Sequence, residues 1–284
     1  MRLVTTEPGG NRQAENSDDK IWQTMPIGTC KLCLTKGVEL QDSHFLPAAA
    51  SRSILKLTGK APVNVTPGLA IQRNERVSDY VLCAACEQRF SKNGEYEFFR
   101  CCVQARGGFP MKELLDARTP IDRERYVTAG IPEIDISRLT YFASSIMWRA
   151  SAHKWGSEKH PPIPPSLGSY EDGLRQYLLG ETDFPENIVL LIGLIPDPQW
   201  QAAAVFPYGG KISLGYCRYK FILLGVAFLF LVGKSIPTNL RLSCTYRSPE
   251  KFIFMGAAVN EMFIRDLGPI VKDARSVGSL RGQG

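Results

Sequence analysis

Two Cys-x-x-Cys pairs constrain this chain more than any other feature of its sequence. They are Cys30-Lys-Leu-Cys33 and Cys83-Ala-Ala-Cys86, with forty-nine residues between them. Four thiolates in this pattern are typical of a structural zinc site with no open coordination position. Such a site contributes on the order of 10–16 kcal/mol that is coupled to folding. The sequence therefore predicts a zinc ion here, and the alternative is four unrelated buried cysteines.

The other cysteines, Cys101, Cys102, Cys217 and Cys244, show no paired spacing, and we expect buried or reduced thiols. The first fifteen residues lack the apolar stretch of a signal peptide. Because disulfides belong to oxidising compartments, the sequence predicts a cytoplasmic protein with metal-bound rather than paired cysteines.

The length of 284 residues predicts more than one domain. A formal net charge of +6 and a pI near 8.9 allow a polyanionic partner without requiring one. Neither property indicates an oligomeric state.

The predicted fold class is α+β, with a cysteine-bearing finger followed by a helical segment and an antiparallel, β-rich C-terminal region. Changes in composition along the chain place the boundaries between these parts. We expect a flexible tail over 1–22, the finger over 23–105, a helical region with a Pro-rich linker over 106–180, a β-rich domain over 181–274 and a second tail over 275–284.

The apolar run Phe221–Val232 is shorter than the roughly 20 residues that a membrane-spanning helix needs. Lys220 and Lys234 flank it, and it is rich in Phe and Val. These features favour one or two buried strands over a membrane anchor. We expect no association with a membrane.

Within the finger, the pattern predicts a strand ending at Pro47, a helix that Gly59 ends, a Pro-containing loop after it, a second strand before Cys83, and a helix after it. Asn93-Gly94 predicts a break in that last helix. Further along, Leu139, Phe142 and Ile146 share one face of a predicted helix. Ser169 is the expected N-cap and Gly180 the expected end of another. Four short apolar segments after 187 predict an antiparallel meander.

The residues inside the cysteine framework add a chemical motif. His44-Phe-Leu-Pro47 stands between the two pairs, and Leu82 and Cys83 open the second pair before a helix. This order resembles the HNH endonuclease family, the zinc-stapled ββα-metal finger, over about residues 28–97. The later stretches YFASSIMWRAS and GLRQYLLG resemble the region that follows this finger in bacterial HNH-like proteins.

The resemblance implies a metal-dependent nuclease acting on nucleic acid, with DNA expected rather than RNA. By position, His44 would be the general base that takes a proton from the attacking water. A divalent ion, Mg²⁺ or Mn²⁺, would stabilise the phosphate and the leaving oxygen. The alternative for a lone histidine is a structural role.

The sequence departs from the family pattern at three places. Ser43 stands where the family commonly has an Asp or His metal ligand; Asp42 could replace it only through a local irregularity, because it shares a strand face with His44. Ser78, beside Asp79, replaces the usual asparagine, and either could orient the base by a hydrogen bond.

At the third place, Glu87 replaces the family's final histidine. Magnesium prefers oxygen donors, so a carboxylate in the first turn of the helix suits that ion. We therefore predict Glu87 as a catalytic-site metal ligand, against the alternatives of a solvated helix-start residue or a partner for Arg89.

Arg89 and Lys92 lie on the same predicted helix and are candidate nucleic-acid contacts, although exposed basic residues are common. Glu95 and Glu97 are expected to face solvent. Arg149, beside Trp148, either docks its helix against the finger or binds a phosphate. His153 and His160 have no spaced partners and are interpreted as surface residues.

Three hypotheses remain open from the sequence. The first is an active HNH-like nuclease that uses His44 and Glu87. The second is a catalytically inactive, zinc-stapled module that binds nucleic acid or protein, in which Ser43 and Ser78 mark lost chemistry. The third, a membrane-associated effector anchored by Phe221–Val232, has the least support.

Overall fold

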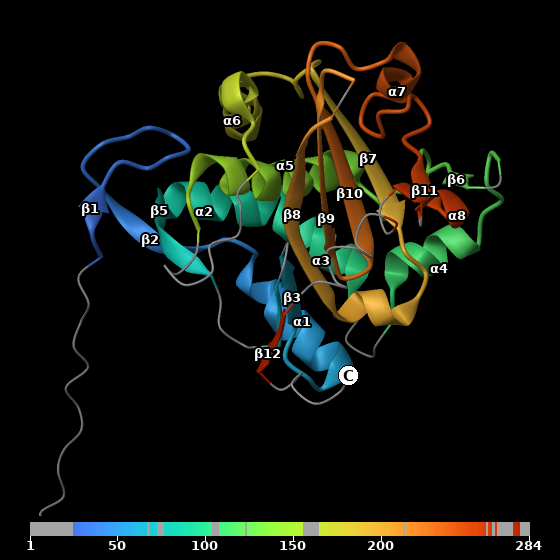
Figure 1. Ribbon diagram of the computed structural model, residues 1–284, viewed down its shortest axis with the longest axis horizontal. Coiled ribbons are helices and arrows are strands. Elements are labelled where there is room, and N and C mark those ends of the chain that lie inside the picture. The colour runs from blue at the N-terminus through green and yellow to red at the C-terminus, as the bar shows by residue number, and fades with distance from the viewer. Residues whose placement is uncertain are drawn as a thin grey trace, which may run out of the picture.

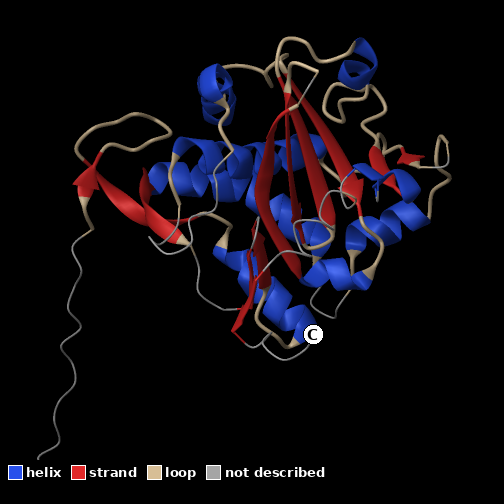
Figure 2. Ribbon diagram, in the orientation of Figure 1, coloured by secondary structure: helices blue, strands red, loops and turns tan. Residues whose placement is uncertain are grey.

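The computed structural model describes residues 25–66, 69–72, 77–103, 108–122, 124–155, 165–212, 214–259, 261–262, 265 and 275–278. The tail predicted for 1–22 and His160 lie outside these residues. Across the described part of the chain the protein is mixed α+β, with a small sheet at one end, a large sheet at the other and helices between them (Figures 1 and 2).

The small sheet has three strands in the order β1-β2-β5, all antiparallel. Their bounds are β1 Ile27–Gly28, β2 Val38–His44 and β5 Ser78–Cys83. Both longer strands were predicted, and α2 (Ala84–Phe90) follows β5 directly. The β2–β5 register shifts between Gln41 and Asp42, and beyond this irregularity His44 lies opposite Ser78.

The large sheet has nine described strands, in the order β12-β4-β3-β8-β9-β10-β7-β11-β6. The pairings are antiparallel except for three parallel ones, β3–β8, β7–β11 and β4–β12. Its strands are β3 Val63–Thr66, β4 Leu69–Gln72, β6 Arg125–Tyr126, β7 Ile188–Leu194, β8 Ala203–Lys211, β9 Cys217–Leu223, β10 Val226–Val232, β11 Ile253–Met255 and β12 Arg275–Gly278.

The apolar run forms two buried strands, in agreement with the prediction of one or two, and they pair as a hairpin. Strands β9 and β10 meet in a two-residue turn at Leu224 and Gly225, with φ of 51° and 80°. Positive φ at both turn residues matches the right-handed twist of the flanking strands. Every residue of β10 is buried. Among the described residues, no helix has the length and apolar character needed to span a membrane.

Three sequence predictions about the sheet are wrong. The expected loop after Gly59 contains β3, which pairs with β8, and the first residues of the expected C-terminal tail form β12. The meander covers only β8, β9 and β10, because β7 pairs with β10 on its other edge. Local pattern cannot reveal these pairings, which join segments far apart in the sequence.

The helix after Cys83 continues through Asn93-Gly94 instead of breaking there. It runs as α2, a π-helical turn η1 (Ser91–Glu95) and α3 (Tyr96–Cys102). A Cβ atom at Gly94 would lie 2.8 Å from the backbone nitrogen and Cα of Phe142. The glycine therefore allows a close crossing with α5 (Ile136–Ala152). At the start of α5, the Asp135 side chain is the N-cap and accepts a hydrogen bond from the Arg138 amide.

The helices α3 and α5 pack on the large sheet through aromatic rings. Phe98 stacks on Phe142 at 4.0 Å between ring centroids, and Phe228 of β10 lies 6.0 Å from Phe98. The remaining helical segments are α1 Ala48–Thr58, α4 Pro110–Asp116, η2 Gly168–Tyr170, α6 Glu171–Leu179, η3 Pro198–Ala202, α7 Thr238–Leu242 and α8 Ala257–Val259.

The predicted helix ends agree with the structure where glycine is required. Gly59 after α1 and Gly180 after α6 both adopt the left-handed conformation, at φ of 67° and 75°. The predicted N-cap Ser169 is wrong by one position: it lies in η2, and Tyr170 precedes α6.

Candidate functional site

The four paired cysteines converge at one point between the small sheet and α2. Their sulfur atoms all lie within 4.8 Å of one another, and Cys33 Sγ is 3.9 Å from Cys83 Sγ. The Lys31 amide donates a hydrogen bond to the Val81 carbonyl, which joins the first cysteine turn to β5.

This cluster fits a metal ion. Tetrahedral Zn–S bonds of about 2.3 Å would place the sulfur atoms roughly 3.8 Å apart, close to the observed spacing. Cys30 and Cys86 are buried, and the hydrogen bond from the Cys86 thiol lowers the pKa of Cys30. The prediction that these cysteines are positioned to hold a metal is confirmed, and the set is compatible with structural zinc. Cys101, Cys102 and Cys244 are buried thiols, as expected.

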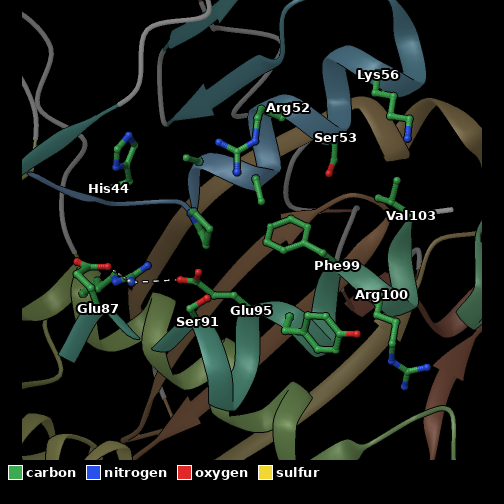
Figure 3. Close-up of a pocket in the computed structure, with 15 residues that line it drawn as sticks. His44, Arg52, Ser53, Lys56, Glu87, Ser91, Glu95, Phe99, Arg100 and Val103 are labelled. Carbon is green, nitrogen blue, oxygen red and sulfur yellow. Dashed lines mark hydrogen bonds and ion pairs between the residues drawn. The ribbon is translucent and has the colours of Figure 1, made fainter. Parts of the chain in front are cut away.

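A cavity of about 710 Å³ lies beside this cluster, between α1 and the α2-η1-α3 segment (Figure 3). His44 reaches it from the end of β2. Most of its lining residues are polar or charged, and two of them carry aromatic rings. The lining residues that matter below are His44, Arg52, Lys56, Glu87, Glu95, Tyr96, Phe99, Arg100 and Arg149.

The cavity brings together the two residues that the sequence singles out for catalysis. His44 and Glu87 both line it, although they come from β2 and α2. His44 Nδ1 lies 3.2 Å from the Asp42 main-chain oxygen. This contact fixes the imidazole ring at the end of the strand and leaves Nε2 as its other polar atom.

Glu87 belongs to a buried charge network with two other residues. Arg149 Nη2 lies 3.2 Å from Glu95 Oε1 and 3.6 Å from Glu87 Oε2. The Arg149 side chain is 1% exposed, and its guanidinium lies 4.6 Å above the Phe90 ring. Arg149 therefore links α5 to α2 and η1, which agrees with the docking role among the two that the sequence allowed.

The π-helical turn explains why Glu87 and Glu95 face the same way. In a regular α-helix, residues eight apart are rotated by about 80°. The i→i+5 bonding of a π turn advances the chain by a smaller angle per residue and recovers that difference. Figure 3 shows both carboxylates directed toward the same guanidinium.

The network leaves polar atoms without protein partners. Glu87 Oε1 and Arg149 Nη1 and Nε are buried and form no hydrogen bond in the described structure. Burial raises the pKa of Glu95, an effect that the nearby positive charge of Arg149 opposes. A buried carboxylate oxygen without a donor is a candidate ligand for a cation.

The residues that replace the family motif have other roles. Ser43 is buried, accepts a hydrogen bond from the Leu82 amide and donates one to the Gln41 carbonyl, so it ties β2 to β5. Asp42 is exposed and does not line the cavity, despite the irregularity beside it.

The histidine expected to lie on the surface without a partner has one. His153 Nε2 lies 2.8 Å from Asp79 Oδ2, and the His153 side chain is 17% exposed. Burial raises the pKa of Asp79, but hydrogen bonds from the Tyr80 amide and from His153 outweigh it and lower that pKa overall. Asp79 is thus engaged with α5 rather than with His44, and Ser78 faces His44 across the ladder.

The predicted nucleic-acid contacts Arg89 and Lys92 are exposed but do not line the cavity. Arg89 donates to the Leu179 carbonyl at the end of α6. The basic residues that do line it include Arg52 and Lys56 on α1. Their spacing of four along a predicted helix could have identified them as a pair on one face.

The expectation that Glu95 and Glu97 face solvent is wrong. Glu97 is 5% exposed and accepts two hydrogen bonds from Arg100, at 3.0 and 2.7 Å. Glu95 is 18% exposed on its side chain because of the Arg149 contact. The sequence does not reveal this because Glu95 and Glu97 alternate with the aromatic residues Tyr96 and Phe98. This local pattern does not define the buried face of the helix, which depends on its contact with α5.

Comparison of the chain with protein-family models, with curated protein sequences and with solved structures finds no match.

Proposed function

We propose that this chain is a metal-dependent endonuclease of the HNH type that hydrolyses phosphodiester bonds of nucleic acid, with DNA as the expected substrate. The observation that carries the proposal is the shared cavity of His44 and Glu87 next to the four-cysteine cluster. The resemblance of the sequence motif to that family supports the same assignment. Structural zinc and a cytoplasmic location, where thiols stay reduced, belong to the proposal.

His44 acts as the general base. When Nδ1–H donates to the Asp42 carbonyl, Nε2 keeps its lone pair and can accept a proton from water. The resulting hydroxide attacks the phosphorus atom, and the P–O bond to the leaving sugar oxygen breaks as the new P–O bond forms. His44 is the last residue of β2. Its ring lines the cavity while its backbone stays paired with Ser78 in the sheet.

Glu87 is the residue that would hold the divalent ion. Its Oε1 atom is buried without a partner, and Oε2 lies 3.6 Å from Arg149 Nη2, which orients the carboxylate. Mg²⁺ or Mn²⁺ held there would polarise the scissile phosphate and stabilise the leaving oxygen. The carboxylate chemistry fits an ion that retains several waters and takes few protein ligands.

The test is cleavage of plasmid and of single-stranded DNA by the purified chain with Mg²⁺ or Mn²⁺. Loss of the base is expected to lower the rate by about 10²–10⁴-fold in His44→Ala. His153→Ala is the matched control, since that ring lies outside the cavity lining. Equal rates for wild type and His44→Ala would overturn the assignment of the base.

One observation favours the second candidate, an inactive module that binds nucleic acid. No carboxylate from β2 lines the cavity in the described structure, and Glu87 already has a cationic neighbour in Arg149. If wild type binds DNA but cleaves none with either metal, the module is the correct function.

A further inference from the structure

We propose that the cavity binds single-stranded nucleic acid, with Arg52 and Lys56 on the phosphates and Tyr96 stacked on an unpaired base. The inference rests on the proposed function in one respect, that this cavity is the substrate site. The inference goes beyond the proposed function because it specifies a single-stranded nucleic acid and assigns its binding to residues outside the HNH motif.

One wall of the cavity is cationic. Arg52 and Lys56 are exposed, line the cavity from α1, and have no ion pair among the described residues. Residues four apart on a helix have Cβ atoms about 5–6 Å apart, so both cations present to one side. Figure 3 shows both on the side of the cavity opposite Glu95. This arrangement suits a chain of phosphates running along α1.

The opposite wall carries aromatic rings. Tyr96 and Phe99 lie one turn apart on α3, and both line the cavity. Tyr96 is 69% exposed, a large apolar area to leave in water. Phe99 is half-buried, and its ring packs edge-on against that of Phe98 at 5.3 Å between centroids. Rings positioned in this way are platforms on which bases can stack.

Basic side chains on one wall and aromatic rings on the other favour a single strand over a duplex. In a duplex the faces of the bases are covered by their neighbours, so a side-chain ring has no base face to contact. In a single strand every base offers a face, and stacking on an aromatic side chain is independent of sequence. The cavity volume of about 710 Å³ lies in the range of about 300–1,000 Å³ found for sites that enclose small ligands, which suits one nucleotide.

The experiment measures binding without cleavage. Fluorescence anisotropy of a labelled oligonucleotide, alone and annealed to its complement, is recorded without added Mg²⁺ or Mn²⁺ and without chelator, so that cysteine-bound zinc is retained. The single strand is expected to bind at least tenfold more tightly than the duplex. Equal or tighter binding of the duplex would overturn the proposal.

Two sets of variants separate stacking from charge. Tyr96→Ala is expected to weaken single-strand binding about tenfold and Tyr96→Phe to preserve it, because the ring rather than the hydroxyl stacks. The double variant Arg52→Ala/Lys56→Ala is expected to lower the slope of log affinity against log salt by about 1.4, or about 0.7 for each phosphate that is no longer neutralised. Lys60→Ala is the control, an exposed lysine just beyond α1 that does not line the cavity.

The result can be told apart from failure of the nuclease proposal. Strand preference and variant effects without any cleavage would support this inference and contradict the nuclease. Cleavage that depends on His44, with no strand preference or no effect of Tyr96→Ala, would contradict this inference and leave the nuclease standing.

Discussion

The four-cysteine cluster and the cavity beside it are adjacent in the chain and opposite in character. Cys86 is the last cysteine of the cluster, and the next residue, Glu87, lines the cavity. In the cluster, four donors point at one another, and a single ion would satisfy all of them. In the cavity, a cation and two carboxylates share one contact network and still leave buried polar atoms without partners. The cysteine cluster is therefore suited to holding one ion, whereas the cavity leaves polar atoms available to a ligand.

The largest expected effect breaks the closed site. Cys86→Ser removes one of four thiol ligands, and a zinc ion held by them would contribute on the order of 10 kcal/mol. We therefore expect loss of bound metal and unfolding of the small-sheet region. Metal analysis of the purified chain and its thermal melt check this. Cys217→Ser, outside the cluster, is expected to retain the metal; if it loses the metal as Cys86→Ser does, the cluster is not the binding site.

The next effect breaks the charge network of the cavity. Arg149→Met leaves Glu87 and Glu95 close together without their counter-charge, and breaking such a buried pair costs roughly 3–5 kcal/mol. Chemical denaturation measures the loss. The further change Glu95→Gln in that variant should recover part of it, since one of the unpaired charges is then gone. A double variant no more stable than Arg149→Met would argue against the network.

A smaller effect concerns the helix crossing that positions the cavity. Gly94→Ala would place a Cβ atom 2.8 Å from the backbone of Phe142, and overpacking of this kind costs roughly 1–3 kcal/mol. The matched control is Gly173→Ala in α6, where the nearest atom, Pro185 Cγ, is 3.7 Å away. That change should stabilise by roughly 0.4–1 kcal/mol. Equal stabilities would show that α5 moves to accommodate the methyl group.

The smallest effect is a dependence on pH. Burial raises the pKa of Glu95 above its value in the unfolded chain, so the folded state binds this proton more tightly. Glu95 therefore adds to the free energy of unfolding below its pKa in the unfolded chain. This contribution declines as the pH rises through its pKa in the folded protein. Glu95→Gln should remove that decline. Chemical denaturation at several pH values from acid to neutral measures this difference. If the free energy of unfolding depends on pH in the same way in wild type and Glu95→Gln, the raised pKa of Glu95 is contradicted.

Much of the finger could be predicted from its sequence because its signals are local. The Cys-x-x-Cys spacing, the strands before His44 and Cys83, and the glycine that ends α1 each act over a few residues. These features place His44 and Glu87 on elements that meet near the four-cysteine cluster.

Other parts depended on contacts that no local pattern records. Glu97 is buried where Arg100 and the Asp135 amide donate hydrogen bonds to it. His153, directly after α5, pairs with Asp79 of β5. The break expected at Asn93-Gly94 became a π turn because α5 crosses there, and a glycine is required for that approach.

The sequence by itself determined the four clustered cysteines, the histidine between them and the β-rich character of the C-terminal half. Their signals come from covalent spacing and hydrophobic period, which are properties of a short segment. Only the tertiary structure decided which charges meet. Arg149 reaches Glu87 and Glu95 from a helix far along the chain, and β3 joins β8 in one sheet. Such pairings depend on burial and close packing of distant segments, and therefore exist only in the folded chain.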